Sequence, residues 1–427
     1  MERDRRDSKA RRGGCGRRDA AIRRRERLCR HDDLGRGEVL QGACHGQGRP
    51  DARRGLPCLA FALAVRQAFL VRAALDAAGA SPCTASHGGA EGGRGFRNGG
   101  RRGANRDRGC ARLHQEVKEV KKVFIDGSAG TTGLRIRERL AMRGDVELVQ
   151  IKDELRKDAA ARRDALNSAD VAFLCLPDVA AREAVSLVEN PETVVIDTST
   201  AHRTEEGWTY GFAELAGMRE RIVSSKRIAN PGCHASGFIA LVAPLVEDGL
   251  IDADAELSAY SLTGYSGGGK KMIAEYEAGE RDNGGCQYAL GQAHKHLPEM
   301  VRYSGLERAP VFSPVVVPHY SGMETVVMLH ASTLKGGGLE DVKECYRKYY
   351  AGEGLVGFSP DPSVCGVISS MAMSGRDDMT VSAYGNDERI VLVSLFDNLG
   401  KGASGAAIQN MNLAIGCRET ESLVCGA

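Results

Sequence analysis

The pattern that most constrains the fold is an apolar segment, a glycine turn and a helix-like segment in direct succession. Residues 122–126 have the composition of a buried strand, residues 127–133 carry a glycine at every third position, and residues 134–142 have a helical pattern. Parallel sheets are built from such units, because a crossover helix must follow each strand and cover one sheet face. The sequence therefore predicts an α/β domain.

The same alternation continues further along the chain. Strands are expected at 146–151, 171–176 and 194–197, with helices at 155–166 and 179–189. Buried strands that alternate with helices are typical of a doubly wound parallel sheet of the Rossmann kind. We assign residues 121–232 to this dinucleotide-binding domain.

After residue 233 the pattern changes to longer strands with few helices between them. The expected strands are 256–263, 311–317, 324–332, 379–384 and 389–396, with one helix at 339–350. This spacing indicates a mainly antiparallel sheet. We expect residues 233–399 to form an α+β catalytic domain that also carries the contacts of a homo-oligomer. Residues 400–427, with a helix at 403–415, are expected to return to the first domain.

The first 120 residues differ in charge from the rest. They carry 27 Lys and Arg against 14 Asp and Glu, a net charge of +13, whereas the remainder carries 31 against 42, a net charge of −11. This extension is rich in Arg and Gly and lacks periodicity, so it cannot bury enough apolar area to offset its chain entropy. We expect it to be mostly disordered. Its apolar segment 59–75 is too polar for a transmembrane helix.

Three explanations of this extension are compatible with its charge. The first is an organelle transit peptide, but acidic residues among its arginines argue against it. The second is a nucleic-acid-binding tail, which would have aromatic residues between its arginines, whereas no aromatic residue precedes Phe61. We favour the third, a reading frame extended upstream of a start between residues 117 and 123. Removal of residues 1–116 is then expected to leave activity and thermal stability unchanged.

The cysteines indicate a reducing environment. The chain has 13 of them at irregular spacings, with no CxxC pair. This predicts neither a zinc site nor a disulfide framework. We therefore expect a cytoplasmic protein with a small-molecule substrate, no metal, no nucleic acid and no membrane partner.

The glycines of the first turn suit a phosphate ligand. They let the backbone turn tightly, so that a phosphate can reach the N–H groups at the start of the following helix. An ordinary tight turn is the alternative, because the GxxGxxG spacing differs from the usual GxGxxG. The expected cofactor-binding residues are Gly127, Ser128, Ala129, Gly130, Thr131, Thr132 and Gly133.

The end of the second expected strand indicates which dinucleotide binds. An NAD site holds its ribose diol with an acidic residue there, and this chain has none at that position. Lys152 comes next, followed by Arg156 and Lys157. These cations suit a 2′-phosphate, so NADP is favoured over NAD. The alternative is that they form a solvated helix face.

Cys233 is a candidate nucleophile. It follows Pro231 and Gly232 and opens an apolar stretch that has the pattern of a buried helix. Free N–H groups and the positive dipole end at a helix N-terminus favour thiolate over thiol. The alternative is that Cys233 is a small buried apolar residue.

A second cluster of chemically active residues is found in HKHLPEM at 294–300. A histidine there would serve as the general acid and base beside a cysteine. A metal site would need a third or fourth ligand at a recognisable spacing. Two surface histidines in a loop are the remaining alternative.

Five segments together resemble one known family. They are IDGSAGTTGL at 125–134, ANPGCHASG at 229–237, SLTGYSGGGK at 261–270, HKHLPEM at 294–300 and DNLGKGASGAAIQNMNLAIG at 397–416. In this order they resemble the N-acetyl-gamma-glutamyl-phosphate reductases of the shorter type, over residues 121–416. The extension 1–120 has no counterpart in that family.

The resemblance implies an activity and a mechanism. The activity is NADPH-dependent reduction of N-acetyl-L-glutamyl 5-phosphate to the semialdehyde in arginine biosynthesis, on a fold like that of aspartate-semialdehyde dehydrogenases. Cys233 would form a thioester, because hydride transfer to a free carboxylate is far harder. His294 is the first choice for proton transfer, with His296 and Glu299 as positioning groups.

The resemblance also implies ligand contacts. Arg203 and Asn230 match positions that bind phosphate, and Ser199 lies at a strand end beside the cofactor. Lys270 matches a loop on the substrate side. Asn398, with Lys401 and Gly402, matches a segment that returns to the nicotinamide. A glycine loop and a helix start explain these last positions equally well.

Other functions stay open. The nearest is a related acyl-phosphate or semialdehyde dehydrogenase that acts on an aminoadipyl or aspartyl substrate. A cofactor-free Cys/His hydrolase would use the same thiol and imidazole but leaves the glycine turn unexplained. A non-enzymatic nucleotide sensor would keep the turn but would not need the thiol.

Overall fold

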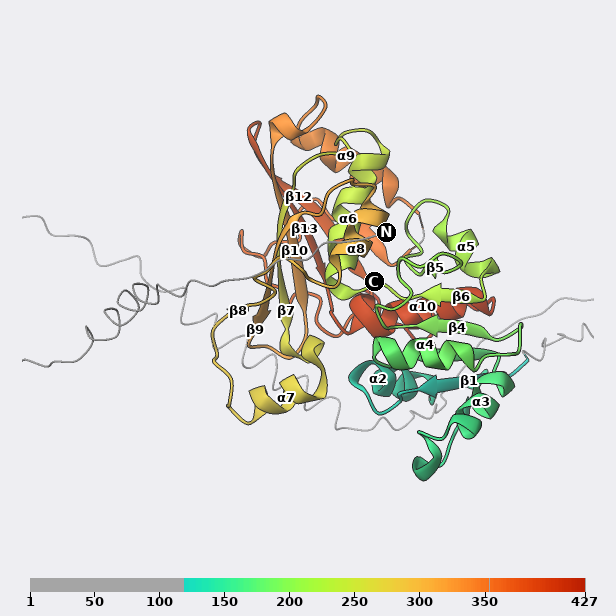
Figure 1. Cartoon of the computed structure of the whole chain (residues 1–427). Coiled ribbons are helices and arrows are strands. Elements are labelled where there is room, and N and C mark those ends of the chain that lie inside the picture. The colour runs from blue at the N-terminus through green and yellow to red at the C-terminus, as the bar shows by residue number, and fades with distance from the viewer. Residues whose placement is uncertain (1–118, 353, 427) are drawn as a thin grey trace, which may run out of the picture. The chain divides into compact units, whose positions relative to one another are not determined.

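The computed structural model describes residues 119–352 and 354–426, so the expectations for the extension concern residues outside this range. Two sheets organise the described chain, and the elements between residues 121 and 229 form the first of them (Figure 1). Its strands are β1 (Lys121–Asp126), β2 (Val146–Val149), β3 (Val171–Leu174), β4 (Val194–Asp197), β5 (Thr209–Tyr210) and β6 (Arg227–Ala229). They lie in the order β2-β1-β3-β4-β6-β5, and every pair is parallel. The doubly wound parallel sheet is therefore confirmed.

Alternating side chains of β1 explain why helices cover both faces. Val123 and Ile125 belong to one apolar cluster, whereas Phe124 belongs to another on the opposite face. Strand residues point alternately to the two faces, so an all-apolar strand needs cover on both. The crossover helices are α2 (Thr131–Leu140), α3 (Ala159–Ser168), α4 (Asp178–Ser186) and α5 (Met218–Ser224).

The helix expected at 155–166 begins later than predicted. A short 3-10 turn, Asp153–Leu155, comes first, and α3 starts at Ala159. Asp158 is the N-cap, because its carboxylate accepts the backbone N–H of Ala161 at 2.9 Å. An aspartate that caps a helix start in this way separates the turn from the helix.

The second sheet is mixed, and four of its six neighbouring pairs are antiparallel. Its order is β11-β12-β13-β10-β7-β9-β8. The parallel pairs are β11 with β12 and β7 with β9. The strands are β7 (Ser258–Gly264), β8 (Cys286–Gln287), β9 (Val311–Val317), β10 (Met323–His330), β11 (Val356–Phe358), β12 (Met379–Gly385) and β13 (Arg389–Phe396). The mainly antiparallel sheet is confirmed, although β8 and β11 were too short to be foreseen.

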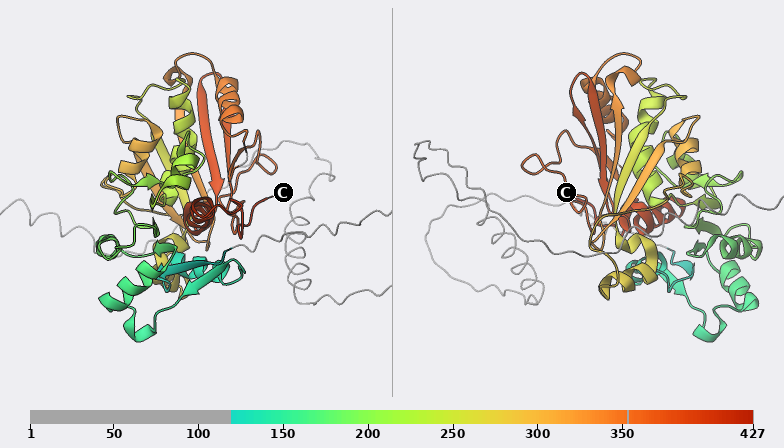
Figure 2. Two further views of the ribbon diagram at one scale, coloured as in Figure 1. Left: turned by 90° about the vertical axis from the view of Figure 1, so that its right-hand side faces the viewer. Right: turned by 60° about the vertical axis from the view of Figure 1, so that its left-hand side comes forward.

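Helices α6 (Cys233–Glu247), α8 (Leu297–Ser304) and α9 (Leu339–Tyr349) lie against one side of this sheet (Figure 2). The interior of α6 is almost wholly apolar, and Phe238, Leu241 and Leu245 are completely buried in the largest apolar cluster. Each such side chain contributes about 1.5–3 kcal/mol relative to full exposure. This burial fixes the position of the first residue of α6, Cys233.

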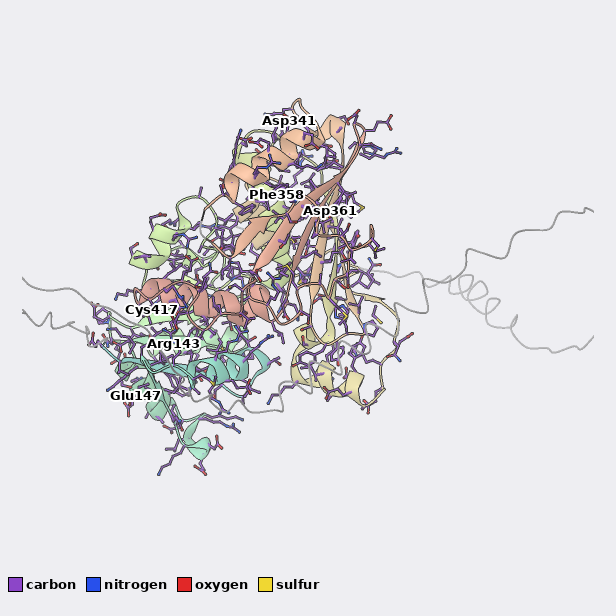
Figure 3. The ribbon with its side chains drawn as sticks, turned by 180° about the vertical axis from the view of Figure 1, so that it is seen from behind. Arg143, Glu147, Asp341, Phe358, Asp361 and Cys417 are labelled. Atoms are coloured by element: carbon purple, nitrogen blue, oxygen red, sulfur yellow. The ribbon has the colours of Figure 1, made fainter. Side chains whose placement is uncertain are left out.

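The end of the chain packs against the first sheet. A π-helical turn, Gly400–Ser404, leads into α10 (Gly405–Ala414), so the single helix expected at 403–415 is divided. Ile408 and Met411 of α10 share an apolar cluster with β1. Arg143 binds both α10 and the segment after it, since its Nη1 donates to Asn412 of α10 at 2.5 Å and its Nη2 contacts Cys417 (Figure 3).

No helix within residues 119–352 and 354–426 is both long enough and apolar enough to cross a bilayer. The remaining helix of the described chain is α7 (Gly269–Glu277), which lies between β7 and β8 in sequence.

Candidate active site

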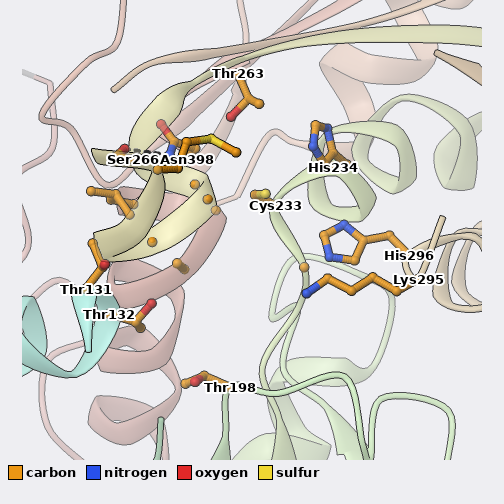
Figure 4. A pocket seen from close by; sticks show the side chains of 18 of the residues that line it. Thr131, Thr132, Thr198, Cys233, His234, Thr263, Ser266, Lys295, His296 and Asn398 are labelled. Atoms are coloured by element: carbon orange, nitrogen blue, oxygen red, sulfur yellow. Dashed lines mark hydrogen bonds between the residues drawn. The ribbon is translucent and has the colours of Figure 1, made fainter. Parts of the chain in front are cut away.

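Cys233 is the first residue of α6 and lines a cavity of about 550 Å³ (Figure 4). Gly232 is the N-cap, and no side chain caps this helix. A Cβ atom on Gly232 would lie 2.4–2.6 Å from atoms of Arg203, Glu299 and His296. Only glycine permits this approach. The Pro-Gly-Cys sequence therefore brings the thiol directly against charged and imidazole groups.

The thiolate expected for the resting enzyme is not what the structure favours. Burial raises the pKa of the Cys233 thiol, and the charge of Arg203 and the backbone N–H of His234 offset this only in part. A buried thiolate loses its hydration free energy, and the helix dipole, which typically contributes below about 1 kcal/mol at exposed sites, does not compensate for this loss. Cys233 therefore needs a base to accept its proton during the reaction.

Three histidine rings line the cavity of Cys233, one more than the sequence analysis assigned. His294 and His296 have ring centroids 4.7 Å apart, and His234 lies 5.2 Å from His294 and 5.7 Å from His296. Phe312 packs edge-on against His234 and His294 at 5.4 Å. The sequence offered one indication of His234, which is that it directly follows Cys233 in the chain.

All three imidazoles are neutral near pH 7. Burial, with smaller contributions from Lys295 and Arg203, lowers the pKa of His294 to about 4. Burial, with the charges of His294 and Lys295, lowers the pKa of His234 to about 3, and burial places the pKa of His296 well below its usual value. A neutral imidazole has one nitrogen with a lone pair, and this nitrogen can take up a proton when the donor that occupies it gives way.

The hydrogen bonds of the three rings differ. His234 bonds Ser261 at 2.9 Å and the Tyr288 hydroxyl at 2.7 Å, so both its nitrogens are occupied. His294 Nδ1 accepts the backbone N–H of His296 at 3.2 Å. The Nδ1 of His296 is buried and has no partner among the described residues.

Glu299 organises the base of the site from α8. Its carboxylate accepts Arg203 Nη1 at 2.7 Å, the Tyr210 hydroxyl at 2.8 Å and the Gly232 N–H at 3.1 Å. Arg203 also donates to the carbonyls of Asn230 and Thr198. Arg203 lines the cavity, whereas Glu299 lies behind it. The glutamate thus fixes both the arginine and the turn before Cys233.

Asn230 and Asn398 line the same cavity, and segments far from each of them in sequence hold their side chains. Asn230 Nδ2 donates to the Ala403 carbonyl at 3.0 Å, and Asn398 Nδ2 donates to Ser266 Oγ at 3.0 Å. A Cβ atom on Gly402 would lie 2.9 Å from Cys233 Cβ. The π-helical turn therefore forms the wall against the nucleophile.

The glycine turn has the geometry of a phosphate cradle. Gly127 has φ +87°, and a Cβ atom there would lie 2.2 Å from the Cys175 carbonyl oxygen. The buried Oγ1 of Thr131, at the start of α2, has no partner among the described residues. Open backbone, a free hydroxyl and a helix N-terminus together fit the pyrophosphate of a dinucleotide.

The turn lies between two cavities. Gly130, Thr131, Thr132 and Gly133 line the cavity of Cys233, whereas Gly127, Ser128 and Ala129 line a second cavity of about 760 Å³. Lys152, Arg156 and Lys157 line the second cavity too.

Arg137, on α2, adds a further cation to the second cavity. The sequence analysis missed it, because its place in the pattern is that of an exposed helix residue. Four cationic side chains therefore line the second cavity, against the two carboxylates of Asp126 and Asp153.

Besides Glu299, two of the site residues assigned from the sequence, Ser199 and Lys270, line neither cavity. Ser199 is buried and donates to Asp197 at 2.7 Å, in a cluster with His202. Lys270 is exposed on α7 and lines neither cavity.

Comparison with known proteins finds a matching two-part organisation. Residues 108–224 match the NAD binding domain of semialdehyde dehydrogenases, and residues 233–398 match their dimerisation domain. The chain therefore has a domain for a nicotinamide dinucleotide and a domain for association.

Solved structures share the fold. Aspartate semialdehyde dehydrogenase II of Vibrio cholerae, complexed with ASA, has a TM-score of 0.53 at 16% identity and covers 70% of this chain and 98% of its own. Aspartate semialdehyde dehydrogenase of Candida albicans with NADP has a TM-score of 0.51 at 17% identity, covering 70% of this chain and 99% of its own.

More similar relatives identify the family. The N-acetyl-gamma-glutamyl-phosphate reductases of Brucella ovis and Brucella canis are each 45% identical over 306 residues, which cover 69% of this chain and 99% of each relative. On this similarity, the chain belongs to the N-acetyl-gamma-glutamyl-phosphate reductase family.

Proposed function

We propose that this protein reduces N-acetyl-L-glutamyl 5-phosphate to N-acetyl-L-glutamate 5-semialdehyde and phosphate, with NADPH, in arginine biosynthesis. The observation that carries the proposal is the thiol of Cys233, at the start of α6, in a cavity that neutral histidines and the glycine turn of α2 both line. A nucleophile, a base and a dinucleotide cradle thus meet in one space.

The first half of the reaction is acyl transfer to sulfur. The Cys233 sulfur attacks the acyl carbon while His294 accepts the thiol proton. The bond between carbon and the phosphate oxygen breaks, and its electron pair leaves with phosphate. Arg203 and Asn230, which line the cavity, are proposed to orient the phosphate. The product is a thioester on Cys233.

The second half releases the aldehyde. When bound, NADPH supplies the hydride that reduces the thioester carbonyl. His294 then returns its proton, Cys233 is restored as a thiol and the semialdehyde leaves. His296 and Glu299 act as positioning residues, since Glu299 lies behind the cavity and holds Arg203.

The choice of NADPH rests on the second cavity. Lys152, Arg156, Lys157 and Arg137 line it, and β2 ends without an acidic residue at the position of the NAD diol ligand. A 2′-phosphate carries two negative charges that these cations would neutralise. Asn398 is proposed to lie beside the nicotinamide, Ser199 to position the strand end and Lys270 to attract an anionic substrate group.

The division of labour follows the two sheets. We propose that residues 121–232 bind the cofactor, that 233–399 carry the reaction and the contacts of a homo-oligomer, and that 400–427 close the cofactor domain from the other end of the chain.

The decisive test combines assay and trapping. Incubation with N-acetylglutamyl phosphate, without NADPH, is expected to add one N-acetylglutamyl group to Cys233, detected by mass spectrometry. Addition of NADPH should then discharge it. Cys233→Ser should lower kcat at least about 1,000-fold.

Two controls define the substrate and the reaction. Assays with aspartyl phosphate and aminoadipyl phosphate should give much lower kcat/KM, and a preference for either would contradict the substrate assignment. Failure to bind NADPH in a fluorescence titration would favour a Cys/His hydrolase instead.

A further inference from the structure

Lys295 lies between the two histidines of HKHLPEM and lines the cavity of Cys233. Its side chain extends beside His296 toward the interior of the cavity (Figure 4). The backbone around it is fixed, because the Leu297 N–H donates to the His294 carbonyl at 3.0 Å and α8 begins at Leu297. Its position is therefore set by the same turn that places the two imidazoles.

The ammonium of Lys295 carries an uncompensated charge. Within the described residues it has neither a hydrogen bond nor a carboxylate at ion-pair distance. Asp178 is within electrostatic range, but its carboxylate accepts the backbone N–H and the hydroxyl of Thr200. The three N–H donors of Lys295 are thus available to a ligand.

Arg203 differs in this respect. Its guanidinium pairs with the buried Glu299 carboxylate at 2.7 Å and donates to two backbone carbonyls. The pair of Arg203 and Glu299 has no net charge, and only the remaining N–H groups of Arg203 can face the cavity. Lys295 therefore supplies the surplus positive charge on this side of the thiol.

Two further features indicate an anion at this position. The first N–H groups of α6 have no side-chain cap, and their helix has 15 residues. The Nδ1 of His296, a residue only 5% exposed, is buried without a partner among the described residues. A lysine ammonium, a helix N-terminus and an unfilled imidazole nitrogen form a built site for a small oxyanion.

We propose that Lys295 is a substrate-binding residue that holds the phosphate of the acyl phosphate and retains it as the carbon–oxygen bond breaks. This inference rests on the proposed function. The electron pair of the broken bond goes to the phosphate oxygen, the proton of Cys233 goes to His294, and Lys295 keeps its own proton. In the reverse direction Lys295 binds inorganic phosphate. Arg203 orients the phosphate together with Lys295 and also holds the turn before Cys233 in place.

The first experiment needs neither cofactor nor turnover. The full chain is alkylated at Cys233 with iodoacetamide, followed by mass spectrometry, at increasing concentrations of inorganic phosphate. Phosphate should slow alkylation of the wild type. In Lys295→Met the half-protecting concentration should rise about 10-fold to 100-fold, as expected for loss of a charged hydrogen bond. Lys295→Arg should restore most of the protection.

Lys348→Met is the matched control, because Lys348 is an exposed lysine of α9 outside both cavities. It should match the wild type in protection and rate. Unchanged melting temperature in Lys295→Met would exclude loss of folding as the cause. Equal phosphate protection in wild type and Lys295→Met would overturn the proposal.

The second experiment distinguishes phosphate from the α-carboxylate of the substrate. In the reverse reaction, Lys295→Met should raise KM for phosphate about 10-fold or more and change KM for the semialdehyde less than about 2-fold. The opposite pattern would mean that Lys295 holds the carboxylate and would overturn the inference. If the wild type showed no turnover at all, the proposed function would fail, while phosphate protection would still test Lys295.

Discussion

At the scale of single residues, the site depends on burial more than on residue type. Cys233 and its three histidines are ordinary titratable groups whose pKa values move because water is excluded around them. Glu299 and Arg203 survive inside the protein only because they pair. Substitutions that change the charge of these buried groups should therefore have large effects on stability.

Replacement of Glu299 should separate the contribution of its ion pair with Arg203 from that of its hydrogen bonds with Tyr210 and Gly232. Glu299→Gln keeps an acceptor for Tyr210 and Gly232 but leaves Arg203 as an unpaired buried cation. We expect the free energy of unfolding to fall by about 3–5 kcal/mol. Urea denaturation measures this, with Glu340→Gln, an exposed residue of α9, as the control. A loss below about 1 kcal/mol would contradict the pairing.

The buried His234 should make stability depend on pH. Its pKa is about 3 in the folded protein and about 6.5 when unfolded, so the unfolded state binds the extra proton between these values. Stability should fall as pH falls from about 6.5 toward 3, in total by about 4 kcal/mol. Urea denaturation at several pH values should show a smaller slope in His234→Gln. His330→Gln, at an exposed position, should keep the wild-type slope.

At the scale of elements, the first turn shows how backbone shape limits the sequence. Gly127 needs both a positive φ and the absence of a Cβ, whereas Gly207 has a similar φ of +83° with nothing within 4 Å of the position of a Cβ. The two glycines therefore separate conformational strain from steric overlap.

Gly207→Ala should cost only the conformational strain, about 1 kcal/mol. Gly127→Ala should lower the free energy of unfolding by about 2–4 kcal/mol, because a Cβ would overlap the Cys175 carbonyl. It should also weaken NADPH binding at least 10-fold, which Gly207→Ala should not. Urea denaturation and fluorescence titration measure the two effects, and equal behaviour of both variants would refute the cradle.

At the scale of the whole molecule, segments far apart in sequence meet behind the nucleophile. Lys401, in the π-helical turn, is completely buried and donates to Glu214 at 2.7 Å and to Gln409 at 2.6 Å. Glu214 also accepts the backbone N–H of Leu355. These bonds connect the π-helical turn beside Cys233 to Glu214, which follows β5 of the first sheet, and to Leu355, which precedes β11 of the second.

A double-mutant cycle tests this tie. Lys401→Met should lower the free energy of unfolding by about 3–5 kcal/mol, because it removes the ammonium that donates to the buried Glu214 carboxylate at 2.7 Å. The double variant with Glu214→Gln should lose less than the sum of the single variants, since no unpaired charge remains. Strictly additive losses in urea denaturation would show that the two groups do not interact.

The sequence by itself determined the doubly wound domain, the mainly antiparallel second sheet and the family, because hydrophobic period, glycine turns and motif order are local properties of the chain. It also identified Cys233, the HKH segment and the glycine turn as one combination. Only the tertiary structure decided which groups meet: His234 and Lys295 joined the site, Arg137 joined the basic cavity, and Ser199 and Lys270 lay apart from both cavities. The sequence favoured a thiolate at Cys233, whereas the structure favours the thiol. The pKa of this thiol depends on its burial, and the neighbours that bury it are separated from it by many residues in the sequence.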